Sequence, residues 1–297
     1  MPPRNEKKML LLGTALWGWK VPKATAFSIL DTFIEAGFNW VDCALNYPIN
    51  GQAEDMGLAI KWLAEWQRSN PANSFFLFLK LGAASNLYSP ESRLDAASLA
   101  GQVAGYSETF GASLKGIGIH WDNRGREETE FPLIAETLDF FSKLEDQGYL
   151  IGFSGVAHPK VYQELAPQLA EKWFIQVKEN MLTSEARKAY LPFFPRAKYI
   201  SYGINMGGIK SGTPPLSNSS LALRNIKHDP AVVERLNALL KQETLPPIPK
   251  NLNDLALSHN YRNNSLAGTI IGPSTIEQTL ATLEYWKALC DSGEYKK

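Results

Sequence analysis

Cysteine and histidine are scarce in this sequence, and their scarcity excludes two kinds of architecture. The 297-residue chain has two cysteines, Cys43 and Cys290, and four histidines. Two cysteines that lie far apart cannot build the framework of a disulfide-rich secreted domain, so we expect a reducing, cytoplasmic compartment. The histidines have neither the spacing nor the cysteine neighbours of a metal-ligand set, and we therefore predict that no metal is bound.

The sequence also has no excess of either charge and no long hydrophobic run. Lys plus Arg number 30, as do Asp plus Glu, so no net field attracts nucleic acid or an anionic membrane, and we expect neither as a partner. No segment approaches the ~20 apolar residues of a transmembrane helix. The apolar stretch Met9–Leu12 is too short for the core of a signal peptide. With 44% hydrophobic and 20% charged residues, the chain is expected to fold as a soluble globule.

Short apolar runs alternate along the chain with longer segments that have helical spacing. The expected strands are Leu10–Gly13, Asn39–Asp42, Phe75–Lys80, Gly116–His120, Tyr149–Ser154, Trp173–Gln176, Lys198–Ser201 and Thr269–Gly272. The expected helices are Ala24–Ala36, Ala53–Trp66, a segment within Pro90–Phe110, Pro132–Gln147, Lys160–Leu169, Ser184–Tyr190, Ala231–Lys241 and Ile276–Leu289. Several of the strands are apolar at every position, which is typical of parallel strands covered on both faces.

Eight strand–helix units in a chain of this length predict a closed (β/α)8 TIM barrel that forms one domain over residues 1–297, since about 250 residues is typical of that fold. An open, doubly wound sheet is the alternative. Its Gly-rich phosphate turn after the first strand is missing, because the chain reads GTALWGWK there. The Ser-, Asn- and Pro-rich stretch Lys210–Lys250 belongs to a long loop after strand seven, where barrels commonly carry function.

Polar residues follow three successive expected strands. Asp42 ends the second strand and Tyr47 lies in its loop, Lys80 ends the third strand, and His120 ends the fourth. Taken singly, each has an ordinary explanation as a turn former, a surface charge, a structural histidine or a packed ring. A barrel, however, brings the carboxyl ends of its strands together around one mouth, which is where barrel enzymes hold their catalytic groups.

Together these four side chains suit the interconversion of a carbonyl and an alcohol. A Lys ammonium near a tyrosine favours the phenolate and lowers the pKa of the phenol, and a paired Asp keeps the Lys charged. Tyr47 then exchanges a proton with the substrate oxygen, while His120 orients that oxygen by hydrogen bonding. No side chain supplies a hydride, so the set requires a cofactor.

At these residues the sequence resembles the aldo-keto reductase family. DCALNY (Asp42–Tyr47) is similar to the family's D-x-A-x-x-Y motif, FFLFLK resembles the strand that ends on its lysine, and GIGIHWD resembles the strand that ends on its histidine. GTALWG, which contains Gly13 and Thr14, is similar to the first-strand pattern. The resemblance covers nearly the whole chain and implies a (β/α)8 barrel, a bound nicotinamide cofactor (NADP or NAD) and reversible reduction of aldehydes or ketones.

The same resemblance implies positions for the cofactor. QGYLIGFS places Ser154, and IQVKEN places Gln176, at the nicotinamide carboxamide, while SYGINMGGIKSG places Tyr202 as the ring that stacks on nicotinamide. The other residues implied to contact cofactor are Gly13, Thr14, Gly272, Ser274, Thr275 and Gln278. Trp17 and Trp121 are candidates for lining a substrate pocket, with packing in the core as the equal alternative.

The sequence departs from the family pattern at several cofactor positions. Gly155 stands where Asn is usual, and Thr282 stands where Asn is expected near adenine. Residues 273–278 include no Lys or Arg, although a 2′-phosphate requires a cationic partner. The loop residues that could supply one are Lys210, Arg224 and Lys227. The choice between NAD and NADP is therefore open.

We expect an NAD(P)-dependent oxidoreductase that acts on a small aldehyde, ketone or sugar, or on the corresponding alcohol. The alternative is a nucleotide-binding sensor or partner subunit on the same barrel with little turnover, which the altered residues Gly155 and Thr282 favour mildly. A barrel hydrolase or isomerase ranks last, because it needs paired carboxylates or a metal and only Asp42 lies at an expected strand end.

Overall fold

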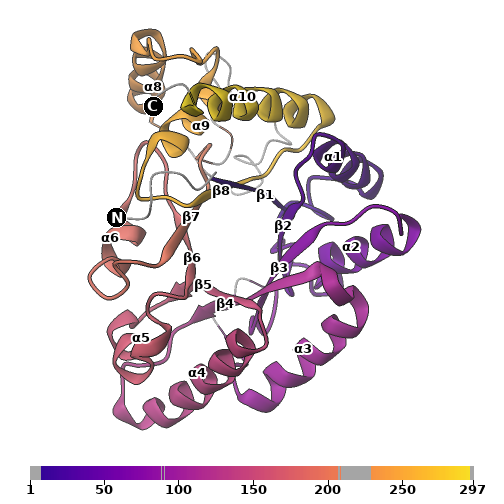
Figure 1. Cartoon of the computed structure of the whole chain (residues 1–297), viewed down its shortest axis with the longest axis vertical. Helices are drawn as coiled ribbons and strands as arrows, with labels where there is room; N and C mark the ends of the chain where they lie inside the picture. Colours follow the sequence, from indigo (N-terminus) through magenta and orange to yellow (C-terminus); the bar gives the residue numbers. More distant parts are fainter. Residues whose placement is uncertain (1–7, 88, 90, 207, 209–228, 295–297) are drawn as a thin grey trace.

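Eight parallel strands close into a barrel in the order of the sequence, β1 to β8, so the predicted (β/α)8 architecture is confirmed (Figure 1). The structure, a computed structural model, describes residues 8–87, 89, 91–206, 208 and 229–294. The strands are β1 Met9–Gly13, β2 Trp40–Ala44, β3 Phe76–Leu81, β4 Leu114–Asp122, β5 Leu150–Val156, β6 Phe174–Lys178, β7 Lys198–Tyr202 and β8 Gly268–Ile271. Pairing of β1 with β8 closes the barrel.

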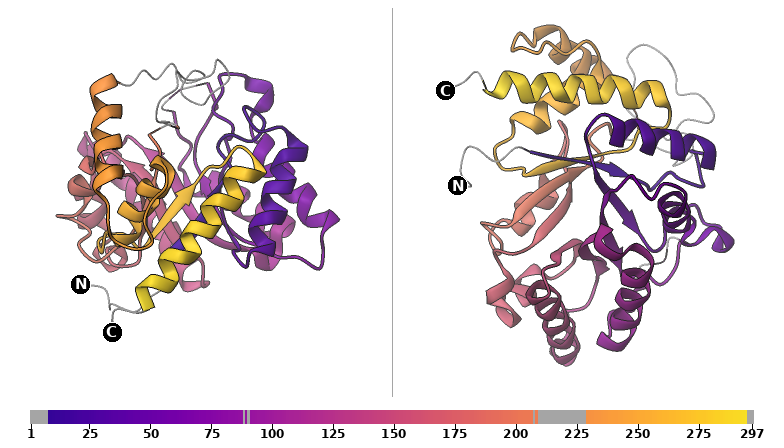
Figure 2. Two further views of the ribbon diagram at one scale, coloured as in Figure 1. Left: turned by 90° about the horizontal axis from the view of Figure 1, so that it is seen from above. Right: turned by 45° about the vertical axis from the view of Figure 1, so that its right-hand side comes forward.

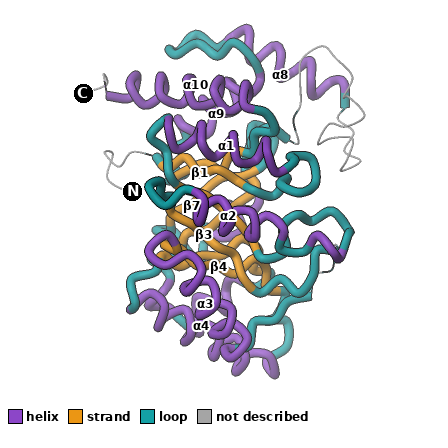
Figure 3. The backbone as a smooth tube through the Cα atoms, turned by 90° about the vertical axis from the view of Figure 1, so that its right-hand side faces the viewer, coloured by secondary structure: helices purple, strands orange, loops and turns teal. Residues whose placement is uncertain are grey.

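Helices surround the barrel on its outer side, so the strands lie inside a helical layer (Figure 3). They are α1 Lys23–Glu35, α2 Leu58–Ser69, α3 Ala96–Phe110, α4 Phe131–Asp146, α5 Pro159–Leu165, α6 Glu185–Tyr190, α8 Pro230–Gln242, α9 Leu252–Arg262 and α10 Ile276–Glu294. The last helix, α10, packs beside α1, and α9 lies between α8 and α10 (Figure 2). None of the helices in the described residues is long and apolar enough to cross a membrane.

The ring of Phe78, from β3, lies inside the barrel, where three glycines on β4 and β5 leave room for it. A Cβ atom on Gly116 would overlap the Phe78 ring, one on Gly118 would lie 2.9 Å from Phe78 Cε1, and one on Gly152 would lie 2.7 Å from Phe78 Cζ. Real Cβ atoms essentially never make contacts this short. Gly116 and Gly118 of β4 therefore reflect the size of the Phe78 ring, and Gly152 of β5 also gives way to the backbone oxygen of Phe174.

The interior of the barrel is layered, with an apolar layer beneath a mostly polar one. The apolar layer consists of Leu11, Phe78, Phe174, Ile200 and Ile270. Side chains on a strand return to the same face every second residue. The residues two positions later on these strands are Gly13, Lys80, Gln176, Tyr202 and Gly272, all of them predicted site residues. Because of this two-residue period, the predicted site lies next to the apolar layer, on the side of the carboxyl ends of the strands.

Several element boundaries differ from the prediction for local reasons. Helix α2 begins at Leu58 rather than Ala53, since Gly57 has a left-handed backbone conformation with φ of 75°. The segment predicted as one helix over Lys160–Leu169 is α5 followed by a short 3-10 turn that begins at Pro167, which ends the α-helix. Helix α9 was not predicted, although Asn251 caps it by accepting a hydrogen bond from the Asp254 N–H. The predicted helix Ala231–Lys241 is present as α8.

Candidate active site

Asp42, Lys80 and Gln176 form a closed hydrogen-bonded ring inside the barrel. Lys80 Nζ lies 2.5 Å from Asp42 Oδ2 and donates to Gln176 Oε1 at 2.9 Å. Gln176 Nε2 in turn donates to Asp42 Oδ1 at 2.6 Å. The three side chains come from β2, β3 and β6, and each residue is at most 2% exposed. The buried ammonium is therefore held between a carboxylate and an amide oxygen, which gives it one orientation.

Tyr47 lies just past the end of β2, with its ring next to the buried lysine. Lys80 Nζ is 5.3 Å from the centre of the Tyr47 ring. The His120 ring meets it edge-on, with the ring centres 5.5 Å apart and the planes at 83°. Tyr47 is 9% exposed and His120 is 8% exposed. The structure thus brings together the four residues predicted as the catalytic set, Asp42, Tyr47, Lys80 and His120.

His120 has a fixed partner that the sequence did not identify. Its Nδ1 lies 3.0 Å from Oδ1 of Asn46, the residue before Tyr47. Burial, followed by the positive charge of Lys80, holds the pKa of His120 well below its ordinary value of 6.5. The imidazole is therefore neutral at neutral pH. The available signal for Asn46 was its place inside the DCALNY motif, in a segment where a polar residue needs a partner if it is buried.

Tyr202 and Ser154 lie at the ends of β7 and β5, where a nicotinamide ring would be placed by the family resemblance. Tyr202 keeps 36% of its surface exposed, so an aromatic face is available for stacking. Partial burial raises the pKa of Tyr202, while the charge of Lys80 and a hydrogen bond with Ser154 oppose this. Gly155 lies against β4, because a Cβ atom there would be 3.3 Å from Trp121 Cβ. A side chain at position 155 would therefore be crowded by Trp121.

The start of α10 carries the residues predicted to surround the phosphate of the cofactor. Gln278 Oε1 accepts hydrogen bonds from the backbone N–H and the hydroxyl of Ser274, at 3.0 and 3.1 Å. Thr275 Oγ1 accepts from the Gln278 N–H at 3.2 Å. Gly272 is open, because a Cβ atom there would have nothing within 4 Å of it. This polar, partly exposed helix start suits an anion through its N–H groups, but a ligand must compete with the Gln278 side chain.

A ladder of side chains lies beside this helix start, between the loop after β7 and the last two helices. Asn205 Nδ2 donates to Asn253 Oδ1 at 2.7 Å, and Asn253 Nδ2 donates to Thr282 Oγ1 at 3.2 Å. Thr282, the other departure from the family pattern, is therefore held by a second asparagine on α9. The candidate cationic partners Lys210, Arg224 and Lys227 lie outside the described residues.

Four further predicted residues have clear positions. Gly13 lies against β8, where a Cβ atom would be 2.7 Å from Ile270 Cγ2. Thr14 is fully buried, and both its N–H and its hydroxyl donate to the carbonyl oxygen of Asp42. The Trp121 ring lies 4.4 Å from the His120 ring. Trp17 is 1% exposed and packs in the main core, in the cluster that also contains Tyr47.

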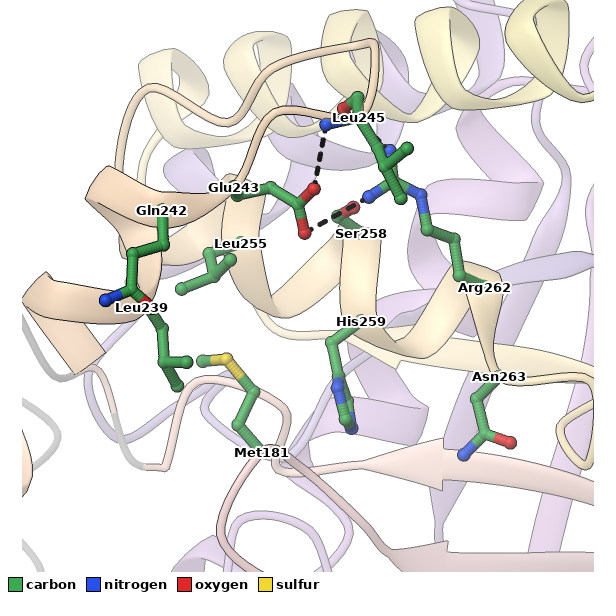
Figure 4. Close-up of a pocket in the computed structure, with 10 residues that line it drawn as sticks. All are labelled: Met181, Leu239, Gln242, Glu243, Leu245, Leu255, Ser258, His259, Arg262 and Asn263. Carbon is green, nitrogen blue, oxygen red and sulfur yellow. Dashed lines mark hydrogen bonds and ion pairs between the residues drawn. The ribbon is translucent and has the colours of Figure 1, made fainter. Parts of the chain in front are cut away.

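A separate hollow of about 600 Å³ lies on the outer side of the barrel, between α8, α9 and the loop after β6 (Figure 4). Its lining includes none of the predicted site residues. Glu243 already pairs with Arg262 at 3.3 Å and accepts from the Leu245 N–H at 2.9 Å. Elsewhere in the described residues, no group of three or more His, Cys, Asp or Glu side chains could hold a metal ion.

Comparison with protein families places this geometry in a known context. The model of the Aldo/keto reductase family matches residues 9–297. None of the curated protein sequences matches the chain closely enough to count as a relative. The family match covers nearly the whole chain, the closed barrel agrees with it, and the chain therefore belongs to the aldo/keto reductase family.

Proposed function

We propose that this protein is an NAD(P)-dependent oxidoreductase that interconverts the carbonyl and alcohol forms of a small molecule. The observation that carries the proposal is the buried Lys80 ammonium, which lies against the Tyr47 ring and is held by Asp42. A cation in this position favours the phenolate over the phenol and so makes Tyr47 a better proton donor to a carbonyl oxygen. Burial strengthens the effect, because few water molecules screen the charge.

Each of the four central residues has a distinct role in this proposal. Tyr47 exchanges the proton with the substrate oxygen. Lys80 adjusts the acidity of Tyr47, and Asp42 keeps the lysine charged and aimed. His120 faces the same substrate oxygen, because its ring meets the Tyr47 ring edge-on, and it orients the substrate there.

The cofactor, when bound, supplies or accepts the hydride. Tyr202 would stack on the nicotinamide, Ser154 would bind its amide, and the start of α10 would hold a phosphate. Gln176 fits a direct contact to the cofactor least well among the predicted residues, because both ends of its amide are engaged by Lys80 and Asp42. We propose that its main role is to complete the buried ring and that it presents only an edge to the nicotinamide.

The first test is turnover and its dependence on Tyr47. The purified protein is mixed with NADH or NADPH and a panel of aldehydes, ketones and sugars, while the absorbance of the reduced cofactor is followed. We expect turnover in the wild type and a loss of at least about 10²-fold in Tyr47→Phe, since general acid–base catalysis contributes that much. Cofactor affinity, measured by quenching of tryptophan fluorescence, should stay the same, and comparing NADH with NADPH identifies the preferred cofactor.

Two outcomes would contradict this proposal. Undiminished turnover in Tyr47→Phe would remove Tyr47 from the role of proton donor. Cofactor binding without turnover on any member of the panel would support the alternative, a nucleotide-binding sensor or partner subunit. The family membership makes that alternative the less favoured one.

A further inference from the structure

The amide of Asn46 has only one orientation that satisfies its surroundings. Asn46 is fully buried, and its Nδ2 donates to the backbone carbonyl oxygen of Ser85 at 3.1 Å. Rotating the amide by half a turn would place two oxygens against each other at that distance and leave both without a donor. A buried carbonyl without a donor is costly, so the Oδ1 atom must face His120.

The orientation of Asn46 decides where the imidazole proton lies. An amide oxygen only accepts hydrogen bonds, and the Asn46 Oδ1 atom is 3.0 Å from His120 Nδ1. His120 must therefore carry a hydrogen on Nδ1. The ring is neutral because it is buried next to the Lys80 ammonium, and a neutral imidazole has one N–H. The other nitrogen, Nε2, then has a lone pair and no hydrogen.

Nε2 is the nitrogen that remains available to a ligand. Among the described residues it has no hydrogen-bond partner, since the interactions of His120 are those with Asn46, with the Tyr47 and Trp121 rings, and with the charge of Lys80. The Nε2 atom is not among the fully buried side-chain nitrogens that lack a partner, so it keeps some accessible surface. A substrate oxygen beside Tyr47 would thus meet an acceptor on His120 instead of a donor.

We propose that Asn46 is a positioning residue that holds His120 as the Nδ1–H tautomer, and that His120 Nε2 accepts a hydrogen bond from a hydroxyl group of the substrate. The second half rests on the proposed function, because it places the substrate oxygen between Tyr47 and His120. An alcohol then makes two hydrogen bonds: it accepts from Tyr47 and donates to His120. A carbonyl makes only the first and faces the Nε2 lone pair, so the site binds the alcohol form more tightly.

The tautomer can be measured directly by nitrogen NMR on protein labelled with ¹⁵N in histidine. Two-bond hydrogen–nitrogen correlations separate a protonated, pyrrole-type nitrogen from an unprotonated, pyridine-type one, and His120→Gln identifies the signals. We expect a pyrrole-type Nδ1 and a pyridine-type Nε2 at neutral pH. A pyrrole-type Nε2 in the wild type would overturn the proposal, whatever the variants show.

Two variants separate the two contacts of Asn46. Asn46→Leu removes the acceptor, so His120 should change to the Nε2–H tautomer, which free imidazole side chains prefer in water. Asn46→Asp keeps the acceptor toward His120, removes the donor toward Ser85 and adds a negative charge. At about pH 9, where a paired imidazole is neutral, this variant should keep the Nδ1–H tautomer. A variant pair with identical tautomers would show that Asn46 does not control the proton.

Ligand preference is tested with cyclohexanol and cyclohexanone as a matched pair. Cyclohexanol is titrated into the complex with reduced cofactor and cyclohexanone into the complex with oxidised cofactor, so neither can react. Between the wild type and Asn46→Leu, the affinity ratio should move toward the ketone by about tenfold, since one neutral hydrogen bond is lost and another gained. An unchanged ratio would overturn the assigned ligand contact. The NMR result needs no cofactor, so a failure of the proposed function would leave the tautomer measurement interpretable.

Discussion

Asp42 and Lys80 are two charges in the interior of the barrel, and their pairing accounts for the fact that both are tolerated there. Their side chains are 3% and 2% exposed, respectively. Moving an unpaired charge from water into such a place costs several kcal/mol. Gln176 accepts a second hydrogen bond from Lys80 and donates one to the other oxygen of Asp42. The Asp42–Lys80 ion pair therefore affects the stability of the protein as well as the candidate active site.

Replacing only one partner of this pair should destabilise the protein strongly. In Lys80→Met, the Asp42 carboxylate loses its cation, and we expect the free energy of unfolding to fall by about 3–5 kcal/mol. The double variant Asp42→Asn/Lys80→Met removes both charges and keeps an oxygen for Gln176, so it should be more stable than Lys80→Met. Urea denaturation of the three proteins at pH 7 measures this. If Lys80→Met were as stable as the double variant, the unpaired Asp42 carboxylate would not be the cause of the destabilisation.

Strands β3, β4 and β5 illustrate how one side chain sets the composition of neighbouring elements. The atoms that would meet a Cβ on Gly116 all belong to the Phe78 ring. Gly116 and Gly118 lower the intrinsic strand preference of β4. The loss is offset because the Phe78 ring packs against the backbone of the neighbouring strand and fills the space.

This dependence predicts a compensating pair of substitutions. Gly116→Ala should destabilise the wild type by about 1–3 kcal/mol, because the barrel is overpacked at Phe78. Phe78→Ala alone should cost about 3–5 kcal/mol through the cavity it leaves. In the Phe78→Ala background the added methyl group has space, so Gly116→Ala should cost much less. Urea denaturation in a double-mutant cycle gives the coupling free energy.

The control for this cycle is Gly101→Ala. Gly101 lies on the exposed face of α3 with nothing within 4 Å of a Cβ position, and alanine there should stabilise the helix by roughly 0.5–1 kcal/mol. Additive free energies at positions 78 and 116 would mean that the glycines are present for some reason other than the ring.

The whole molecule should become less stable in mild acid because of His120. Its folded-state pKa is well below 6.5, so between those two values the unfolded chain binds more protons than the folded one. The free energy of unfolding is then highest above about pH 6.5 and falls as the pH decreases through that window, by at most about 1.4 kcal/mol per pH unit for one group. Urea denaturation between pH 8 and 5 should show this slope.

A matched pair of histidine variants checks the origin of the slope. His120→Gln cannot ionise, so its stability should depend less on pH over the same window. Burial also lowers the pKa of His259, but that residue is exposed, so His259→Gln should change the slope less. The carboxyl groups whose pKa is lowered by hydrogen bonds, such as Glu130, act at lower pH. Parallel curves for the wild type and His120→Gln would assign the acid sensitivity to other groups.

The order of the elements, the closed barrel and the inward residue at the carboxyl end of most strands could be predicted from the sequence. These depend on local information: apolar runs, helical spacing, and the two-residue period that turns Lys80 to the same side as Phe78. The family resemblance added the roles of residues that have ordinary explanations when taken singly. Helix boundaries near Gly57 and Pro167 were less accurate, because single residues there override the hydrophobic pattern.

The pairing of the polar groups, in contrast, depends on the three-dimensional arrangement of the chain. Gln176 and Asp42 are 134 positions apart, and His120 and Asn46 are 74 positions apart. Such contacts depend on strand register and on the path of a loop, and neither leaves a periodic signal in the sequence. For the same reason the sequence could not show that three glycines make room for Phe78, or that one amide sets the position of the proton on His120.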